Sequence, residues 1–529
     1  MTRRIYLYDS TLRDGAQTSG VDFTAADKQN IALKLDQFGI DYIEGGWPGA
    51  NHTDDEFFSH MPKLNHSHLC AFGMTRRAKT SAQNDPGLAA LLNSGAESIC
   101  LVGKSWDFQV TEALNVPLVE NLKMIEDSMS HLVSKNREAI FDAEHFFDGF
   151  KANKEYAIKA LLAAKENGAR WIVLCDTNGG TLPHEISEIV KAVTKHIDSE
   201  FLGIHCHNDS EHAVANSIAA VLAGVSQVQG TLNGVGERCG NANLISIIPT
   251  LKLKLGFDVG ISDKKLTKLT KLSRFLDDKL NRASNNFAPY VGASAFAHKG
   301  GLHVSAVMKN PSCYEHIKPE SIGNVRKILV SDQGGRANIL SRLNDIGIDT
   351  EKQDHNKISS LIDLIKERES RGYSYDSADA SFAILAEQIF ADLPNFFHTE
   401  NLKINDERKW DKDGKLSVFS EAHVKITVGK DTLETSATGN GPVNALDKAI
   451  RKALVKTYPT LADVELVDYK VRIINSANGT EAITRVLIES EDKAGNKWTT
   501  IGVSENIIDA SYNALRDSLI YKLIQDSHL

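Results

Sequence analysis

The chain has 529 residues, a length that holds two or three domains with large hydrophobic cores. Its formal net charge of -9 at pH 7 argues against nucleic acid or an anionic membrane as a partner. No apolar run approaches the ~20 residues of a membrane helix, and a predicted strand begins at Arg4. We therefore expect a cytoplasmic protein without a signal peptide or anchor. The 6 cysteines are scattered and form no Cys-x-x-Cys pair, which predicts reduced thiols and neither disulfides nor a cysteine zinc site.

Strand-like and helix-like segments alternate over the first half of the chain. The runs that predict strands are residues 4–8, 42–45, 69–74, 98–102, 139–143, 171–175, 201–207 and 227–232. The segments with helical periodicity are residues 24–38, a short stretch near 54, 86–93, 116–136, 154–167, 183–196, 213–222 and 242–255. Eight successive strand–helix units over roughly 250 residues predict an α/β fold, a closed parallel (β/α)8 TIM barrel. A doubly wound open sheet is the alternative.

The alternation stops after residue 255, and the rest of the chain predicts two further parts. Residues 261–399 are polar and largely helical, which indicates a helical linker or lid region. The charged, apolar-poor stretch 400–416 is interpreted as a boundary. Beyond it, two successive strands-then-helix patterns without clustered candidate ligands predict a C-terminal α+β domain for regulation or assembly. The predicted domains are therefore residues 1–260, 261–399 and 400–529.

The end of the seventh predicted strand carries the strongest chemical signal. His205 and His207 are two residues apart in a strand, so their side chains point to the same face. A glycine-rich segment after the eighth strand ends at Asn241, and Asp14 follows the first strand. The carboxyl ends of barrel strands meet at one rim, and two imidazoles with two oxygen donors suit a divalent cation of intermediate hardness. We predict a metal site, with a structural histidine pair as the alternative and Asp9 as a competing carboxylate.

Other polar residues follow the same strand ends. Arg13 is placed to bind a substrate carboxylate or stabilise an enolate; its alternative interpretation is a surface ion pair. Glu144 and His145 end the fifth strand, where a carboxylate acts as a general base or orients a histidine that does. A structural use of both fits the sequence equally well. His303 and Tyr314 lie outside the barrel and reach its rim only if the linker folds back.

Three motifs give the chain a wider resemblance. They are Asp9-x-Thr11-Leu12-Arg13-Asp14-Gly15-x-Gln17, His205-x-His207-Asn208-Asp209 and Asn233-Gly-x-Gly-Glu-Arg-x-Gly-Asn241. With these motifs the whole chain resembles the metallolyase barrels that include the isopropylmalate, homocitrate and citramalate synthases. The first motif is shared with related lyases and carboxylases. The third, followed by a linker and a C-terminal domain, is typical of the synthases.

Three further segments resemble the citramalate synthase branch of this family. They are Glu44-Gly-Gly-Trp47-Pro48-Gly-Ala-Asn51, Asp142-Ala-Glu144-His145-Phe-Phe-Asp148-Gly149 and Ile328-Leu-Val-Ser331-Asp332-Gln333-Gly-Gly-Arg336. Typical isopropylmalate synthases carry Glu-Ala-Gly-Phe-Pro after the second strand instead. The resemblance implies an acyltransferase of isoleucine biosynthesis. Such an enzyme condenses acetyl-CoA with pyruvate in a Claisen reaction and hydrolyses the thioester to citramalate and CoA.

The resemblance also implies roles for individual residues at the rim. A divalent metal ion (Mg, Mn or Zn) would chelate the 2-oxo acid, held by Asp14, His205, His207 and, in some members, Asn241. Arg13 would neutralise charge that develops on oxygen, and Thr177 would hold the substrate carboxylate.

Proton transfer and regulation complete what the resemblance implies. Glu144 and His303 would remove a methyl proton from acetyl-CoA, with His303 supplied by the second subunit of a homodimer. Tyr314 would assist hydrolysis. In this family the C-terminal domain binds an end-product amino acid at a dimer interface, and in the citramalate branch the expected inhibitor is isoleucine.

Three other functions are compatible with the sequence. A 2-isopropylmalate synthase of leucine biosynthesis, acting on 2-oxoisovalerate, would need a wider pocket; the side chains around Met74 and Val102 are candidates for closing it. A related metal-dependent lyase would cleave a carbon–carbon bond without hydrolysing a thioester. A non-catalytic sensor would bind metal and amino acid, but it would have no need of Arg13, Glu144 and His303 together.

Overall fold

The structure, a computed structural model, describes residues 3–280, 282, 284–329, 336–346, 348, 353–375, 378–390, 393–474 and 482–527. The chain divides into two compact units. The first comprises residues 1–296 and 316–326, and the second residues 297–315 and 327–529. Within the described residues, no helix is long and apolar enough to cross a membrane.

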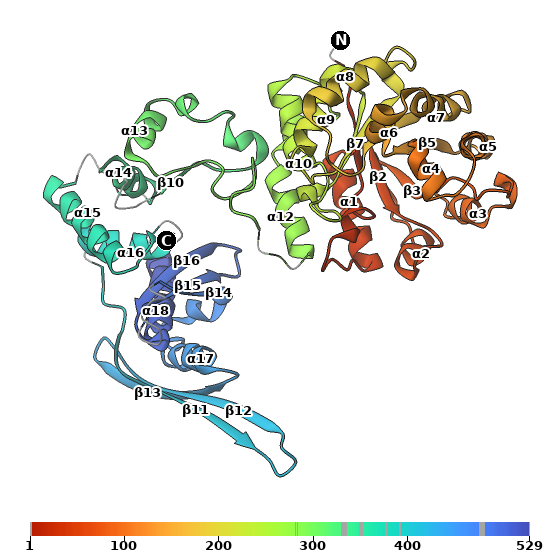
Figure 1. Ribbon diagram of the computed structural model, residues 1–529. Coiled ribbons are helices and arrows are strands. Elements are labelled where there is room, and N and C mark those ends of the chain that lie inside the picture. The colour runs from red at the N-terminus through yellow and green to blue at the C-terminus, as the bar shows by residue number, and fades with distance from the viewer. Residues whose placement is uncertain are drawn as a thin grey trace. The chain divides into compact units, whose positions relative to one another are not determined.

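The first unit is a closed barrel of eight parallel strands (Figure 1). The strands are β1 (Tyr6–Asp9), β2 (Tyr42–Gly46), β3 (His68–Met74), β4 (Ser98–Lys104), β5 (Glu138–Glu144), β6 (Trp171–Asp176), β7 (Leu202–Cys206) and β8 (Gln227–Gly230). Each strand pairs with the next, and β8 pairs with β1 in the register Tyr6 to Gln227, which closes the ring. The predicted (β/α)8 barrel is confirmed, and the open-sheet alternative is wrong.

Helices follow the strands and cover the outside of the barrel (Figure 1). They are α1 (Ala25–Phe38), α2 (His52–Ser59), α3 (Pro86–Asn93), α4 (Asp107–Glu112), α5 (Leu118–Ser134), α6 (Phe146–Ala152), α7 (Lys154–Glu166), α8 (Pro183–Val193), α9 (Ala213–Ala223) and α10 (Leu244–Pro249). The first helix illustrates how the sequence sets the bounds. Thr24 caps α1 reciprocally with Asp27, and Gly39 ends it with φ 108°, a left-handed conformation that favours glycine.

Two hydrophobic layers hold the barrel together. Apolar side chains on the outer face of the strands are buried under the helices. The interior is filled by aromatic rings, thiols and branched side chains, namely Tyr8, Tyr42, Cys70, Phe72, Cys100, Ile140, Trp171, Val173 and Cys175. All six cysteines are free, as predicted. Because these side chains fill the interior, a substrate site is expected at the rim where the strands end.

The chain leaves the barrel through α11 (Asp263–Leu266) and α12 (Leu269–Lys279), which belong to the first unit. The second unit begins with a predominantly helical part. Its elements are β9 (Ala297–His298), α13 (Gly301–Lys309), β10 (Lys327–Ile328), α14 (Arg336–Asp345), α15 (His355–Ser370) and α16 (Asp379–Phe390). Residues 331–335 of the motif that ends at Arg336 lie outside the described residues.

The C-terminal part repeats one pattern twice, a three-stranded antiparallel sheet followed by a helix. The first copy contains β11 (His398–Trp410), β12 (Leu416–Val428), β13 (Asp431–Gly439) and α17 (Pro442–Leu454), and the second β14 (Glu465–Ile473), β15 (Thr484–Glu491), β16 (Lys497–Ser504) and α18 (Ile507–Ser527). Residues 400–416, which were interpreted as a boundary, do not form a linker. They lie within the β11–β12 hairpin, and their side chains are mostly exposed there. The division at residues 260 and 400 stays a prediction.

Candidate active site

Three predicted metal ligands lie together at the barrel rim. Asp14 follows β1, His205 is in β7 and His207 follows it; all three are buried. Asp14 Oδ2 is 3.3 Å from Nε2 of His205 and 3.6 Å from Nε2 of His207. The two Nε2 atoms are 3.1 Å apart. One ligand atom of each residue therefore faces a common point, as binding of a single cation requires.

Asn241 completes the cluster because a short segment after β8 is bonded to the end of β7. Ala242 N donates to Cys206 O, and Asn208 N donates to the carbonyl of Gly240. The Nδ2 of Asn241 lies 2.9 Å from Asp14 Oδ2 and 3.2 Å from His205 Nε2. Its Oδ1 is buried and has no hydrogen-bond partner among the described residues.

The donor set fits a divalent cation. A buried amide oxygen without a partner is costly, and rotating the Asn241 amide by half a turn would direct that oxygen at Asp14 and His205. The cluster would then offer two nitrogens and two oxygens, a combination that suits a cation of intermediate hardness. Arg238 donates to Nδ1 of His207 at 2.7 Å, so the proton of neutral His207 lies on Nε2. That proton must leave Nε2 before this nitrogen can bind a cation.

The charges and hydrogen bonds of the cluster favour an ionised Asp14 and a protonated His205. Burial would raise the pKa of Asp14, but the charge of Arg13 and hydrogen bonds from the two histidines hold it well below its ordinary value. Burial would lower the pKa of His205, yet the hydrogen bond to Asp14 raises it overall. Burial lowers the pKa of His207. Asp14 is therefore an ionised ligand over the physiological range of pH.

The competing carboxylate, Asp9, forms its hydrogen bonds with Thr11 and not with the residues of this cluster. Its two oxygens accept from the backbone N–H and the hydroxyl of Thr11, at 2.9 and 3.0 Å. Burial raises the pKa of Asp9 to about 7. Asp9 thus closes the turn that follows β1.

Arg13 is buried in an ion pair, so its interpretation as a surface pair is wrong. Its Nε donates to Glu44 Oε2 at 2.7 Å, and Nη1 is 3.6 Å from Asp14 Oδ2. The guanidinium also lies over the ring of Phe72. These contacts hold a fixed cation beside the predicted metal ligands, where negative charge on a substrate oxygen would develop.

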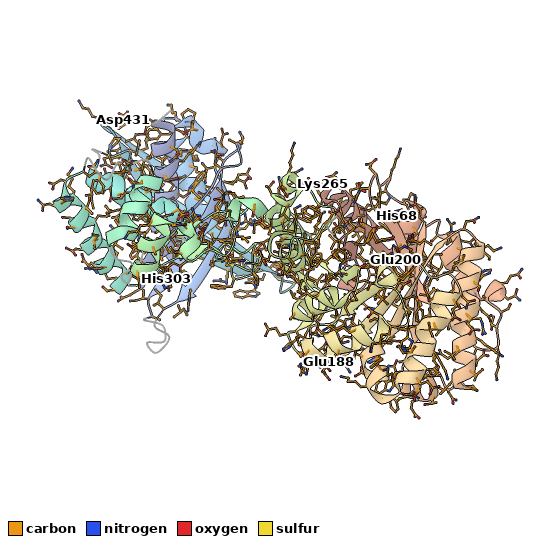
Figure 2. The ribbon with its side chains drawn as sticks, turned by 90° about the horizontal axis from the view of Figure 1, so that it is seen from above. His68, Glu188, Glu200, Lys265, His303 and Asp431 are labelled. Carbon is orange, nitrogen blue, oxygen red and sulfur yellow. The ribbon has the colours of Figure 1, made fainter. Side chains whose placement is uncertain are left out.

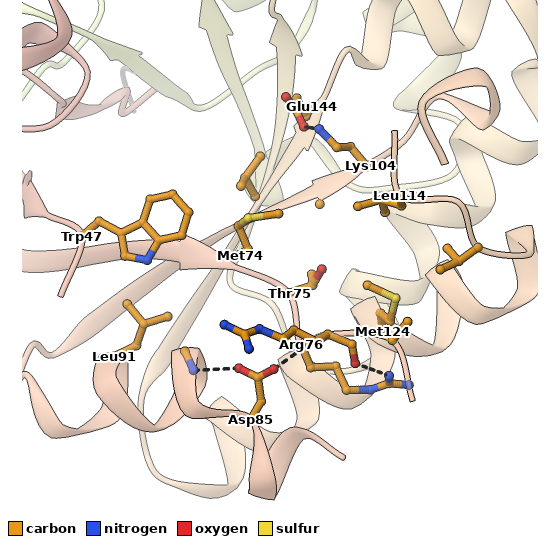
Figure 3. A pocket seen from close by; sticks show the side chains of 16 residues that line it. Trp47, Met74, Thr75, Arg76, Asp85, Leu91, Lys104, Leu114, Met124 and Glu144 are labelled. Atoms are coloured by element: carbon orange, nitrogen blue, oxygen red, sulfur yellow. Dashed lines mark hydrogen bonds and ion pairs between the residues drawn. The ribbon is translucent and has the colours of Figure 1, made fainter. Parts of the chain in front are cut away.

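Glu144 ends β5 and pairs with Lys104, which ends β4. The two side chains line one side of a pocket of about 280 Å³ (Figure 3). Met74 and Val102, the residues expected to limit substrate size, also line this pocket. A carboxylate beside an amphipathic pocket is a suitable general base for an acidic C–H group of a bound substrate.

Thr177 follows β6 and is part of the same rim. Its Oγ1 accepts a hydrogen bond from the backbone N–H of His145 at 2.8 Å, which leaves the hydroxyl hydrogen as a donor. His145 itself has φ 52° and pairs with Asp148 through Nδ1 at 3.0 Å. The Nδ1 of His145 is therefore held by Asp148. Contact between Thr177 and a substrate stays a prediction.

His303 and Tyr314 belong to the second unit. Their rings stack with centroids 4.2 Å apart, and both side chains are exposed; His303 is labelled in Figure 2. The structure therefore brings these two residues together with each other. Their action at the barrel rim stays a prediction.

The sequence analysis missed several partners of the site residues. These are Glu44, Phe72, Lys104, Gln229 and Arg238. Glu44 stood within a quoted motif, and its charge in an otherwise apolar strand was an available signal. The others carry no local pattern, because each meets its partner from another strand or loop of the barrel.

Comparisons with known proteins identify the family of this chain. Residues 4–275 match the HMGL-like family, residues 290–370 the homocitrate synthase post-HMGL domain-like family, and residues 376–523 the LeuA allosteric (dimerisation) domain. The chain is 51% identical to the (R)-citramalate synthase of Aquifex aeolicus, over 99% of both chains. It is 50% identical to the (R)-citramalate synthase of Geobacter sulfurreducens, over 98% of this chain and 97% of the other.

A third relative is more distant. The chain is 30% identical to a probable 2-isopropylmalate synthase of Methanopyrus kandleri, over 97% of both chains. The identity to the citramalate synthases is thus about 20 percentage points higher over the same length. This chain belongs to the HMGL-like family, in the branch of the (R)-citramalate synthases.

Proposed function

We propose that this chain condenses acetyl-CoA with pyruvate and hydrolyses the thioester, releasing citramalate and free CoA. The observation that carries the proposal is the 51% identity to an (R)-citramalate synthase over 99% of both chains, together with the family matches over residues 4–275, 290–370 and 376–523. The reaction makes this chain an acetyl-CoA-dependent transferase. Its product would feed isoleucine biosynthesis.

The metal centre of the proposed enzyme is the buried cluster at the rim. A divalent cation, Mg, Mn or Zn, would be held by Asp14, His205, His207 and Asn241. When bound, such a cation polarises a carbonyl as a Lewis acid. Arg13 supplies a second positive charge on the same side of the site, and the Thr177 hydroxyl donates to the carboxylate of the 2-oxo acid.

Glu144 is the proposed base for the methyl group of acetyl-CoA. It lines the pocket that also contains Lys104, with which it forms an ion pair. His303 of the partner subunit acts with Glu144 in this proposal, and Tyr314 assists hydrolysis of the thioester. The match of residues 376–523 to a dimerisation domain supports the homodimer that this arrangement needs.

Regulation is assigned to the C-terminal domain, residues 400–529 by the predicted division. Its two sheet–helix repeats form a core separate from that of the barrel. The matched family is described as allosteric. We propose isoleucine, the end product expected for this branch, as the feedback inhibitor bound there.

Product analysis tests the proposal. Purified protein is incubated with acetyl-CoA, pyruvate and Mn²⁺, and free thiol and citramalate are measured together. The proposal predicts equal amounts of the two, and no thiol from a His205→Ala variant. Citramalate without free thiol, or cleavage of added citramalate to smaller acids without CoA consumption, would contradict it and favour a lyase.

A further inference from the structure

A chain of buried hydrogen bonds runs away from the predicted metal ligand His205, beneath the rim. Nδ1 of His205 lies 2.8 Å from Oε1 of Gln229 in β8. Nε2 of Gln229 donates in turn to Oδ1 of Asp142 in β5, at 3.1 Å. Gln229 and Asp142 are buried, with exposed fractions of 1% and 3%. The chain therefore crosses the barrel interior without contact with solvent.

The carboxylate at the far end decides the direction of every bond in this chain. An ionised Asp142 only accepts hydrogen bonds, so the NH₂ group of Gln229 must face it. The amide oxygen of Gln229 then faces His205 and accepts from Nδ1. Burial raises the pKa of Asp142 to about 6, so the carboxyl group is ionised at pH 8. Neutral His205 is thereby held as the tautomer with its proton on Nδ1 and a free lone pair on Nε2.

The neighbouring histidine has the opposite arrangement. Arg238, which always donates, faces Nδ1 of His207 at 2.7 Å. Neutral His207 therefore carries its proton on Nε2, the nitrogen that faces the cluster. Of the two histidines, only His205 already presents a lone pair toward Asp14.

We propose that Gln229 and Asp142 are positioning residues for the cation site, which together fix His205 in the tautomer and orientation that bind a cation through Nε2. The inference rests on the proposed metal centre and goes beyond it by assigning a function to two residues that are not themselves predicted ligands of the cation. A hydrogen-bond acceptor behind a ligating histidine holds the ring and raises its basicity.

The same strand supplies a matched control. Gln227 is two residues before Gln229, so its side chain points to the same interior face of β8. It is fully buried, and its amide atoms have no hydrogen-bond partner among the described residues. Replacing Gln227 by Met thus makes the same change in size and polarity at the same depth, without touching the chain to His205.

The test is a titration of the metal-stripped, full-length protein with Mn²⁺ at pH 8, in which free Mn²⁺ is measured by its electron paramagnetic resonance signal. We expect Gln229→Met to weaken binding about 10- to 100-fold, and Gln227→Met to bind like the wild type. The double variant Gln229→Glu/Asp142→Asn should restore binding to within about threefold, because the introduced amide donates to the introduced carboxylate, which still accepts from Nδ1. Asp142→Asn should weaken binding, since an amide no longer fixes the direction of the chain.

The outcomes separate the inference from the proposal beneath it. If the wild type binds Mn²⁺ and Gln229→Met binds equally well, the inference is wrong and the metal centre stands. Equal losses in Gln227→Met and Gln229→Met would also overturn it, because the loss would then follow from packing. If the wild type itself binds no Mn²⁺, the proposed metal centre fails and the inference fails with it. Circular dichroism verifies that each variant is folded, and Asp142→Asn serves as the second test should Gln229→Met not fold.

Discussion

At the scale of single residues, the rim is organised around the buried pair of Arg13 and Glu44. The two groups are 2.7 Å apart, and the Tyr8 hydroxyl donates to the second oxygen of Glu44 at 2.7 Å. Glu44 is fully buried, and Arg13 is largely so. A buried charge is tolerated only when it is paired and hydrogen-bonded. The pair therefore fixes where the free NH groups of Arg13 point.

Neutralising Glu44 tests whether the buried charge of Arg13 depends on its partner. Glu44→Gln should lower the free energy of unfolding of the barrel by about 3 kcal/mol, because the Arg13 charge would remain buried without its partner. It should also lower kcat/KM, because the guanidinium is released from its position. The unfolding midpoint in urea, followed by tryptophan fluorescence, measures the first effect. Glu97→Gln is the control, since Glu97 pairs with His68 in an exposed position and should leave the midpoint unchanged. Equal midpoints for both variants would contradict the account.

Proton binding at His205 predicts the pH dependence of metal affinity. The folded protein raises the pKa of this imidazole above 6.5, and a cation binds only its deprotonated form. Mn²⁺ affinity should therefore fall as the pH is lowered through the pKa of His205, by about tenfold per pH unit for one displaced proton. Titrations from pH 8.5 to pH 6, at about 0.1 M salt, measure the slope. A constant affinity over this range would contradict the account, because it would show that no proton on His205 competes with the cation.

Much of the cluster could be predicted from the sequence, but its support could not. His205 and His207 share a face through the two-residue period of a strand, and Asp14 and Asn241 follow neighbouring strands of a closed ring. Both relations follow from the strand period and from the order of the strands along the sequence. The acceptor behind His205 is Gln229, and the position of that side chain depends on the register between β7 and β8. Metal binding by the four residues of the cluster stays a prediction.

At the scale of elements, the end of β8 positions Asn241. Thr231 N donates to Ala242 O at 3.0 Å, and Leu244 N donates to Thr231 O at 3.0 Å. Gly230, the last residue of β8, lies directly against this returning segment. A Cβ atom added there would stand 2.3 Å from Ala242 O, closer than atoms can approach. The close approach requires glycine and holds Asn241 beside His207.

Gly230→Ala should accordingly push residues 241–243 away from the strand. We expect Mn²⁺ affinity to fall about tenfold or more, because one ligand moves, together with a loss of stability of about 1–3 kcal/mol from overpacking. Gly441→Ala is the control, because no heavy atom lies within 4 Å of its added Cβ and its φ of -173° is open to any residue. Unchanged Mn²⁺ affinity in Gly230→Ala would contradict the assignment of Asn241.

Helices with one buried face and strands buried on both faces were predictable from the sequence. The helix expected at residues 116–136 is α5 (Leu118–Ser134), preceded by Pro117. The strand expected at 227–232 ends at Gly230, because the chain turns there and Asn233 adopts φ 55°. The β11–β12 hairpin could not be identified, since both of its faces are largely exposed and its polar composition matches that of a linker.

At the scale of the whole molecule, the proposed catalytic and regulatory functions belong to parts of the chain with different cores. The barrel core and the core of the two C-terminal repeats are separate hydrophobic clusters. The order of the parts was predictable from the change in alternation along the sequence. The contribution of His303 and Tyr314 to the rim stays a prediction from the family resemblance, because it depends on an assembly of subunits and not on any local pattern.

Isoleucine inhibition is the prediction at this scale. Millimolar isoleucine should lower the rate of thiol release several-fold, whereas lysine at the same concentration should have no effect. The reason is differential affinity: a ligand shifts activity only if it binds one state of the enzyme more tightly. Steady-state rates at fixed acetyl-CoA and pyruvate measure the effect. Unchanged activity with millimolar isoleucine would count against the proposed effector and would leave the reaction itself untouched.

The substrate preference of the purified enzyme tests the central claim most directly. Thiol release from acetyl-CoA is measured with pyruvate, 2-oxobutanoate, 2-oxoisovalerate and 2-oxoglutarate, with and without Mg²⁺ or Mn²⁺. The account predicts metal-dependent release with a strong preference for pyruvate. A preference for 2-oxoisovalerate would contradict it and make the chain a 2-isopropylmalate synthase, and no release with any of the four acids in the presence of metal would contradict the synthase function altogether.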